Sequence, residues 1–234
     1  MRVVEARDVH KVFGAVSALR GVTLDVADGE SVVIFGPNGA GKTTFLKIAA
    51  TLMRPTAGRV RLFGEDPADN PRLRRHLGLV SHHSYLYGAL SGLENLVFAA
   101  RGYGVADPWG RAEALLDAVG LWGRRHDPVR TYSHGMVRRL SIARALVHDP
   151  PLLLLDEPFV GLDRAAADLL VGLLTRMRSS RTVVLTTHSI EQGLALADRV
   201  VILVDGRVAY QAPNGFPDRQ AAERLYAELV GAQT

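Results

Sequence analysis

Residues 36–43 have the composition of a phosphate-binding loop. They read Gly-Pro-Asn-Gly-Ala-Gly-Lys-Thr, which fits the pattern G-x-x-x-x-G-K-[ST]. The loop follows the apolar run Ser31–Phe35 and precedes an apolar-periodic stretch, so we place it between a buried strand and a helix. Backbone N–H groups in such a loop, together with the helix amino terminus, form a cradle for anions, and glycine lets the backbone approach a phosphate. The sequence therefore predicts nucleotide binding.

Single side chains in two segments have predicted roles. Lys42 is expected to reach the β- and γ-phosphates, and the Thr43 hydroxyl to ligate Mg²⁺. The apolar run 151–155 ends in Asp156-Glu157, and strand carboxyl ends are where open α/β sheets bind ligands. Asp156 is predicted to hold Mg²⁺ directly or through water, and Glu157 to orient or deprotonate the attacking water. An ordinary solvated acidic turn is the plainer alternative.

The elements that must position these residues follow from hydrophobic periodicity. Alternating or fully apolar runs predict five strands at residues 22–26, 31–35, 152–155, 182–186 and 200–204, and a further one around Val60 and Leu62. Helical spacing predicts helices over 41–52 and 220–230 and a mainly helical segment from about 93 to 147. It also predicts a helix that carries Leu169, Leu170, Leu173, Leu174 and Met177. The alternation of strands and helices favours a doubly wound α/β sheet with a helical lobe inserted into it.

Composition excludes several classes of protein. The 234 residues include no cysteine, which excludes disulfides, thiolate zinc sites, iron–sulfur clusters and cysteine nucleophiles. Lys and Arg number 28 against 24 Asp and Glu, and a surplus this small neither shows nor excludes nucleic-acid binding. No apolar run approaches the roughly 18 residues of a membrane span, and residues 1–5 do not open a signal peptide. We expect a soluble protein of a reducing compartment.

Five segments, taken in order, resemble the ATP-binding subunit of an ABC transporter. They are the loop 36–43, the signature-like segment Tyr132–Met136, the pair Asp156-Glu157, the D-loop 161–163 and His188. The resemblance covers nearly the whole chain and implies an α/β fold: a P-loop NTPase (RecA-like) core with an N-terminal antiparallel β segment and an inserted α-helical subdomain. It implies a single ATP-binding domain over 1–234, with the core at about 1–82 and 148–210. The helical subdomain would lie at about 83–147 and a short C-terminal helix at about 219–231.

The resemblance also implies a site that two subunits share. Lys42, Glu157 and His188 would be catalytic, with His188 contacting the γ-phosphate and holding the water and Glu157. The residues implied to bind ATP are Phe13, Gly36, Pro37, Asn38, Gly39, Ala40, Gly41, Lys42, Thr43, Thr44, Ser133, Gly135 and Asp163. ATP and Mg²⁺ are the expected cofactors. A homodimer, or a pair of cassettes, would bury two ATP molecules between its subunits, with Ser133 and Gly135 facing the nucleotide of the other subunit.

Plainer interpretations of three of these residues stay open. Ser133 and Asp163 have the side chains of helix N-caps, and a cap can also be a ligand. Phe13, placed by resemblance on adenine, can equally pack against its own domain. The expected partners are integral membrane subunits, with no nucleic-acid partner. The chain would then be cytoplasmic and peripheral on the cytoplasmic face of the membrane.

The sequence departs from the family pattern at Phe159 and Val160, which replace small polar residues after Pro158, and at two places among the predicted site residues. His82 stands where the family carries a glutamine that senses Mg²⁺, so we assign it to the metal site through a bridging water, or to coupling with the membrane partner, since Mg²⁺ prefers oxygen ligands. The signature-like segment has Tyr132, His134 and Met136 in place of leucine, glycine and glutamine. Ser133 and Gly135, which the implied mechanism needs most, are present.

A finer resemblance concerns the cargo. His82 followed by 86–96 resembles the ATP-binding subunit of the haem exporter of cytochrome c maturation, and about thirty residues after Val204 leave little room for an importer's regulatory domain. We expect an ATPase that powers export, with haem as the specific cargo. The alternatives are a generic drug, lipid or polysaccharide export ATPase, and an ABC ATPase that takes no part in transport. The cluster Tyr85–Tyr87 is predicted either to anchor a membrane subunit or to pack the helical lobe onto the core.

Overall fold

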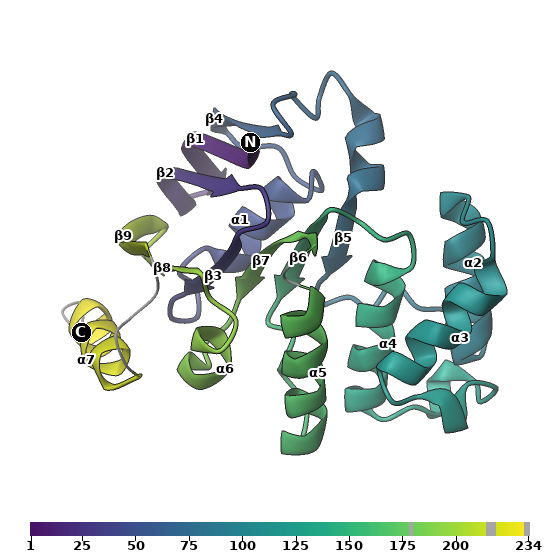
Figure 1. Ribbon diagram of the computed structural model, residues 1–234. Helices are drawn as coiled ribbons and strands as arrows, with labels where there is room; N and C mark the ends of the chain where they lie inside the picture. The colour runs from purple at the N-terminus through teal and green to yellow at the C-terminus, as the bar shows by residue number, and fades with distance from the viewer. Residues whose placement is uncertain (178–179, 214–218, 232–234) are drawn as a thin grey trace.

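Two β-sheets of different kinds form the framework of the molecule (Figure 1). The structure, a computed structural model, describes residues 1–177, 180–213 and 219–231. A three-stranded antiparallel sheet has the order β2-β1-β4, with bounds β1 Arg2–Phe13, β2 Val16–Ala27 and β4 Ala57–Leu62. The larger sheet has the order β5-β6-β7-β3-β8-β9 and is parallel except for its last strand. Its strands are β3 Ser31–Phe35, β5 Leu77–Val80, β6 Leu152–Asp156, β7 Thr182–Thr186, β8 Arg199–Val204 and β9 Arg207–Pro213.

The inner strands of the larger sheet are buried on both faces, which explains their continuous apolar runs. Side chains alternate between the faces, so in β3 Val32 and Ile34 join one core while Val33 and Phe35 join the other. The first core lies between the two sheets and includes helix α1, Lys42–Ala49. The second core lies under the helices on the opposite face, among them α5, Arg164–Met177. The two cores fix the carboxyl ends of the strands at one edge of the sheet.

A lobe of helices lies beside the sheet, at the right of Figure 1. It contains α2, Gly92–Tyr103, α3, Pro108–Ala118, and α4, His134–Leu146. A capping box between Ser91 and Glu94 begins α2, and the accepted bonds lower the pKa of the Glu94 carboxyl. Short 3₁₀ turns complete the connections, at Pro71–His76, Trp122–Arg124 and Val129–Thr131. The described residues of the lobe have no named strand between Val80 and Leu152, as predicted.

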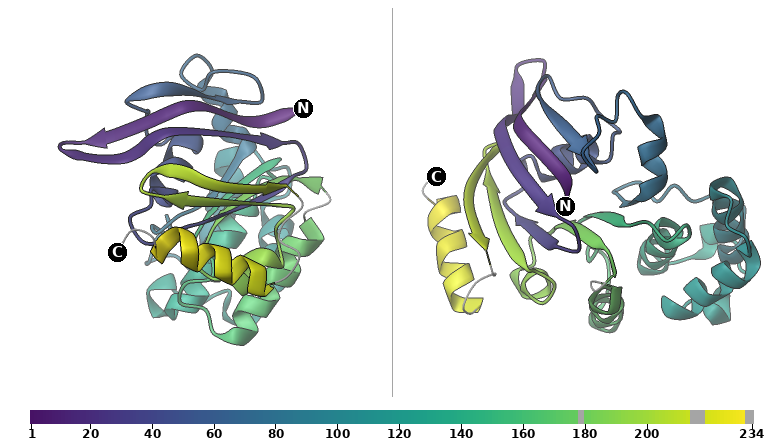
Figure 2. Two further views of the ribbon diagram at one scale, coloured as in Figure 1. Left: turned by 90° about the vertical axis from the view of Figure 1, so that its left-hand side faces the viewer. Right: turned by 45° about the horizontal axis from the view of Figure 1, so that its top comes forward.

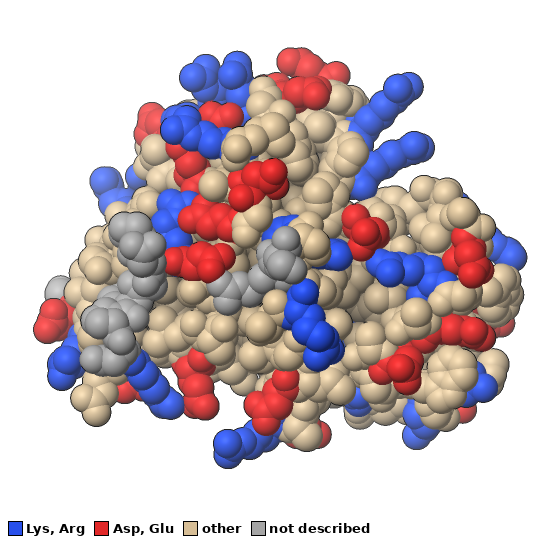
Figure 3. All heavy atoms as spheres, in the orientation of Figure 1, with Lys and Arg blue, Asp and Glu red and all other residues tan. Residues whose placement is uncertain are grey.

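Arg199 joins the larger sheet to the antiparallel one. Arg199 of β8 donates to the Glu30 carboxylate and to the Asp25 carbonyl, and Arg7 pairs with the Asp25 carboxylate. The bond from Arg7 holds the pKa of Asp25 below its usual value. Figure 3 shows acidic and basic side chains mixed over this part of the surface. Helix α7, Arg219–Gly231, lies along the far edge of the molecule (Figure 2), where Arg219 pairs with Glu191 of α6, Ile190–Leu194.

The predicted fold class is confirmed, with differences at the level of single elements. Strands β3 and β7 have the predicted bounds, and the antiparallel β segment implied by the resemblance is present, whereas hydrophobic periodicity gave no bounds for β1, β9 or α6. The helix predicted to run to residue 52 ends at Ala49, since Thr51 is left-handed at φ 60° and no glycine announces the turn. Across the part of the chain that the structure describes, every helix is too short or too polar to span a bilayer.

Candidate functional site

The phosphate loop connects β3 to α1 with its backbone closely packed. A Cβ on Gly36 would lie 2.3 Å from the Leu203 carbonyl oxygen, so only glycine fits there. Gly41 precedes the helix at φ 98°, a left-handed conformation that glycine adopts without strain. Lys42 is buried, and its ammonium donates to the carbonyls of Gly36 at 2.6 Å and Pro37 at 3.1 Å. The loop therefore holds the cation of Lys42 at its own centre.

Strand β6 brings an acidic side chain against the loop. The Asp156 carboxylate accepts a hydrogen bond from the Thr43 hydroxyl at 3.0 Å and another from the Thr186 hydroxyl at 2.8 Å. Thr43 lies in the first turn of α1 and Thr186 ends β7, so the carboxylate of Asp156 joins three elements. Two hard oxygen ligands 3.0 Å apart beside a phosphate cradle suit Mg²⁺, which is bound by one or two carboxylates together with substrate phosphates. The described residues contain no group of three or more His, Cys, Asp or Glu side chains that could hold a metal ion alone.

Glu157 follows in a strained conformation that two neighbours support. Its φ of 48° is left-handed, and its N–H donates to the Thr186 carbonyl at 3.0 Å. One carboxylate oxygen lies 3.6 Å from the Lys42 ammonium, and the other accepts from the His188 ring Nδ1 at 2.9 Å. Because a carboxylate only accepts, this bond requires a proton on Nδ1 of His188. Lys42 and His188, two of the predicted catalytic residues, thus both contact the third, Glu157.

The predicted ATP-binding residues fall into two groups. A cavity of about 450 Å³ is lined by Phe13, Ala18, residues 37–44, His82, Asp156 and Glu157. Phe13 is 46% exposed at its edge, with the Lys11 ammonium 5.2 Å from the ring centre. His82 reaches this cavity from the segment after β5, so it lies beside the predicted metal ligands.

The second group lies at the starts of two helices. Ser133 caps α4, its hydroxyl accepting from the Met136 N–H at 3.3 Å, and Asp163 caps α5 by accepting from the Ala166 N–H at 2.8 Å. A Cβ on Gly135 would lie 3.3 Å from the Gly161 carbonyl, so the signature-like segment and the D-loop are in close approach. Ser133, Gly135 and Asp163 do not line the cavity of the first group.

One departure from the family pattern has a packing explanation. Tyr132 is buried in the helical lobe, where its hydroxyl donates to the Arg124 carbonyl at 2.7 Å. Burial raises the pKa of this phenol. The hydroxyl lies where a Cβ on Gly92 would come within 2.5 Å, so the tyrosine and the glycine fit as a pair. For His134 and Met136 the structure offers no comparable explanation.

Sequence reasoning missed two residues of the site. Thr186 bonds both Asp156 and Glu157, and its place at the end of an apolar strand was a usable signal. Arg138 of α4 donates to the carbonyls of Ser81 at 2.7 Å, Asp156 at 2.8 Å and Glu157. No pattern identified it, because it is one of two adjacent arginines that resemble the polar face of a helix.

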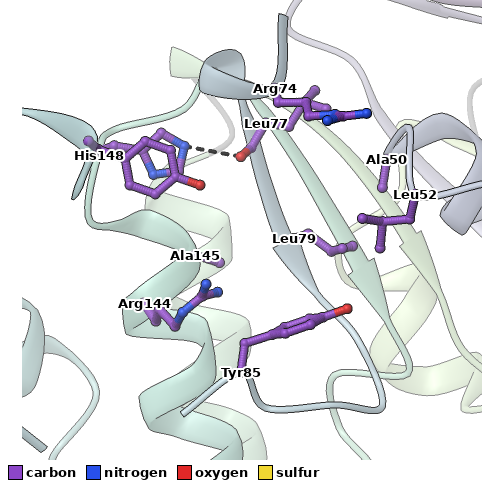
Figure 4. Close-up of a pocket in the computed structure, with 10 residues that line it drawn as sticks. Ala50, Leu52, Arg74, Leu77, Leu79, Tyr85, Arg144, Ala145 and His148 are labelled. Carbon is purple, nitrogen blue, oxygen red and sulfur yellow. Dashed lines mark hydrogen bonds between the residues drawn. The ribbon is translucent and has the colours of Figure 1, made fainter. Parts of the chain in front are cut away.

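The predicted partner surface is an open aromatic groove. A cavity of about 500 Å³ is lined by Tyr85, Leu86, Tyr87, Asn95, Phe98, Ala99, Gly102, Tyr103 and Arg144. Tyr87 and Phe98 are 55% and 58% exposed and meet edge to face. A smaller cavity adjoins it (Figure 4), where the Arg144 guanidinium lies 5.4 Å from the centre of the Tyr85 ring. The aromatic side chains face outward more than they pack the lobe onto the core.

Comparisons with known proteins agree on one family. Residues 19–160 match the family described as ABC transporter. The chain is 38% identical to the daunorubicin/doxorubicin resistance ATP-binding protein DrrA of Streptomyces peucetius, over 92% of this chain and 66% of that protein. It is 37% identical to the Nod factor export ATP-binding protein I of Cupriavidus pinatubonensis, over 93% and 69%. It is 36% identical to the phosphonates import ATP-binding protein PhnC of Anaeromyxobacter dehalogenans, over 97% and 48%. The chain thus spans about two thirds or less of DrrA and PhnC.

Solved structures share the architecture. The dimeric post-hydrolysis state of the ATP-binding cassette MJ0796 bound to ADP and phosphate superposes with a TM-score of 0.84 at 30% identity, covering 91% of this chain and all of that one. A structure described as the ATP binding subunit of an ABC transporter gives a TM-score of 0.87 at 32% identity, covering 97% of this chain and 99% of the other.

Proposed function

Since the chain belongs to the ABC transporter family and is an ATP-binding and ATP-hydrolysing cassette, we propose that it powers the export of a small organic cargo through separate membrane subunits. The observation that carries the hydrolytic part of the proposal is the contact of Glu157 with both Lys42 and His188 beside a phosphate loop. The Streptomyces and Cupriavidus relatives are named for drug resistance and Nod factor export, which supports export over import. The phosphonate relative is named for import, so both directions of transport occur among the relatives, and export is part of what we propose.

Hydrolysis follows from the residues around Glu157. The loop N–H groups and Lys42 bind the β- and γ-phosphates, and Thr43 and Asp156 supply oxygen ligands for Mg²⁺. The metal supplies charge neutralisation at the phosphates when bound. Glu157 accepts the proton of a water whose oxygen bonds to the γ-phosphorus, while the bond to the leaving ADP oxygen breaks. The hydrogen bond from His188 Nδ1 fixes the orientation of the Glu157 carboxylate.

The second group of residues supports a shared site. Ser133, Gly135 and Asp163 do not line the nucleotide cavity of their own subunit. In a dimer, these residues of one subunit would contact the nucleotide bound to the other subunit. The dimeric form of the MJ0796 cassette supports such a pair. Membrane subunits would insert a helix into the groove at Tyr87 and Phe98, which exposed aromatic side chains suit as anchors. The chain would then be held peripherally on the cytoplasmic face.

A narrower cargo, haem, is favoured only by the segment 86–96 after His82. The relatives named above are drug, Nod factor and phosphonate transporter subunits, and none of their names concerns haem. Deleting the gene distinguishes the cargoes. Loss of covalently attached haem in c-type cytochromes would support haem export, whereas sensitivity to amphipathic drugs with intact cytochromes would support generic export.

The test of the hydrolytic role is Glu157→Gln. The variant should bind ATP and form a stable ATP-bound dimer while phosphate release falls about 10²- to 10⁴-fold, because general-base catalysis is removed and binding is retained. Glu113→Gln, at an exposed position of α3, is the matched control and should keep the wild-type rate. Undiminished phosphate release by Glu157→Gln would show that another group activates the water.

A further inference from the structure

One side chain of the helical lobe holds the backbone at two strand ends of the core. Arg138 lies in α4, five residues after the Ser133 cap. Its guanidinium donates from Nη1 to the Ser81 carbonyl at 2.7 Å, and from Nη2 to the Asp156 carbonyl at 2.8 Å and the Glu157 carbonyl. Ser81 follows β5 and Asp156 ends β6, and these strands are parallel neighbours. A single cation therefore joins the signature helix to both strand ends.

The bonding of Arg138 points to positioning of backbone. All three acceptors are main-chain carbonyls. Burial lowers the pKa of the guanidinium, opposed by the negative charges of Asp156 and Glu157, and its Nε is buried with no hydrogen-bond partner among the described residues. Removing a cation from water costs free energy, and the three hydrogen bonds to carbonyls offset this cost. We therefore expect these hydrogen bonds to fix the positions of the three carbonyls.

The carbonyls that Arg138 holds belong to the segments that form the nucleotide cavity. Ser81 precedes His82, which lines that cavity. Glu157 has its N–H bonded to the Thr186 carbonyl and its own carbonyl bonded to Arg138, so β7 and α4 fix the two sides of this strained residue. A left-handed non-glycine residue persists only where its surroundings hold it. The direction of the Glu157 carboxylate toward Lys42 thus depends on α4.

From this geometry we infer that Arg138 is a positioning residue that couples the signature segment to the hydrolytic base of the same subunit. The inference rests on the proposed function. When Ser133 and Gly135 contact the nucleotide of the other subunit, any shift of α4 passes through the guanidinium to Glu157 and His82. The nucleotide at one site thereby sets the geometry of the base at the other, and the coupling is reciprocal because it is a free energy between two sites.

A planar guanidinium is required for this role. Two nitrogens in a fixed plane reach carbonyls on separate strands, whereas a lysine ammonium is a single point donor on a flexible stem. Arg138→Lys keeps the charge and removes the fork. The next residue supplies a matched control, since Arg139 also donates to main-chain carbonyls, at Val119 (2.8 Å) and Gly120 (3.0 Å), but inside the lobe.

The experiment compares the full-length variants Arg138→Lys, Arg138→Gln and Arg139→Lys in steady-state phosphate release, nucleotide affinity and melting temperature. We expect kcat to fall about 10- to 100-fold in both Arg138 variants, since small misplacements of a catalytic group have effects of this size. The affinity of the isolated subunit for ATP should stay within about 2-fold, because the loop is untouched. Arg139→Lys should keep the wild-type kcat.

A double variant separates positioning from general damage. If Arg138 acts through Glu157, Glu157→Gln/Arg138→Lys will hydrolyse ATP at the same residual rate as Glu157→Gln alone. A further loss in the double variant, or parallel loss of melting temperature and ATP affinity in both Arg138 variants, would overturn the inference. So would an unchanged kcat in Arg138→Lys beside an impaired Glu157→Gln. Full activity of Glu157→Gln itself would instead overturn the proposed function.

Discussion

The two groups of predicted nucleotide-binding residues are positioned by different means. Around the cavity, side chains distant in sequence meet because the carboxyl ends of β3, β6 and β7 share one edge of a parallel sheet. Lys42, Asp156 and Glu157 are then fixed by bonds to one another or to their immediate neighbours. At the helix starts, the side chains of Ser133 and Asp163 accept hydrogen bonds from their own first turns, and the described residues show no other side-chain hydrogen bond for either.

This difference separates what one subunit can do from what it cannot. The core group is complete in a single chain and predicts ATP binding by a monomer. The helix-start group does not line that cavity, and a helix amino terminus has unsatisfied donors and a positive dipole. We therefore expect substitutions in the first group to weaken binding, and those in the second to impair dimerisation and turnover.

The largest effect should come from Lys42→Met, which keeps the buried stem and removes the cation. Phosphate release should fall about 10²- to 10³-fold, as when one donor to a developing charge is removed, and the isolated subunit should lose ATP affinity as well. Nucleotide titration and phosphate release measure the two effects. Lys47→Met, in the last turn of the same helix, is the control and should behave as wild type. Unchanged ATP affinity in Lys42→Met would contradict the assignment of the loop.

Ser133→Asp tests the second group with the helix cap retained. Aspartate caps as well as serine, so the melting temperature should hold, but its carboxylate would repel the γ-phosphate of the other subunit. We expect turnover and ATP-driven dimerisation to fall about 10²-fold while the isolated subunit binds ATP normally. Asp107→Ser, a cap exchange at the exposed start of α3, should leave turnover intact. If Ser133→Asp dimerises as the wild type does, Ser133 acts as a helix cap and does not contact the nucleotide of the other subunit.

The sequence predicted the core group well because its signals are local. A phosphate loop between an apolar strand and a helix, and an acidic pair ending another apolar strand, each define a position within a few residues. Strand β1 was missed for a physical reason, since its register shifts beside Ala6 and Val9 break the alternation that identifies a half-buried strand. Antiparallel pairing with β2 and β4 holds it in place, and no short window contains that information.

Arg138 could not be predicted because its partners lie 57, 18 and 19 residues away. The adjacent Arg139 has the same side chain and a different destination. Similarly, Ser133 and Asp163 were recognised as caps or ligands, and a single chain satisfies only the first description. The type of a residue shows which contacts its side chain can make. Only the tertiary arrangement decides which of several residues of the same type contacts the site.

A smaller effect in the core group is expected from Phe13→Ala. Stacking of a base on an aromatic ring contributes about 1–3 kcal/mol, and the partial exposure of this ring places it near the lower end, so ATP affinity should fall about 5-fold. Phe13→Tyr retains the ring face and should bind as wild type. Titration with ATP and with inorganic triphosphate separates the contributions, because only ATP has an adenine. Equal losses for both ligands would show that Phe13 packs the domain and does not stack on the base.

The smallest effect concerns His148, which lies between the helical lobe and the larger sheet. His148 follows α4 and stacks on Tyr103 of α2 at 3.7 Å between ring centres. It also bonds the Leu77 carbonyl of β5 at 3.0 Å (Figure 4). Burial lowers its pKa from 6.5 to about 4, and the positive charges of Arg144 and Arg111 act in the same direction. The Leu77 carbonyl and Asp149 oppose the shift. The folded protein therefore holds a neutral ring at a pH where the unfolded chain holds an imidazolium.

His148→Gln should consequently flatten the pH dependence of stability. Because the unfolded chain takes up the proton first, wild-type stability is fully present above about pH 6.5 and declines as the pH falls toward 4. The ring is partly exposed, so we expect a loss on the order of 1 kcal/mol. Denaturant unfolding at pH 7.5 and pH 5 measures it in both proteins, and glutamine keeps a donor for the Leu77 carbonyl. Equal pH dependence in the wild type and the variant would show that His148 is protonated as readily in the folded protein as in the unfolded chain. The lobe and the core would then not shield this residue from water.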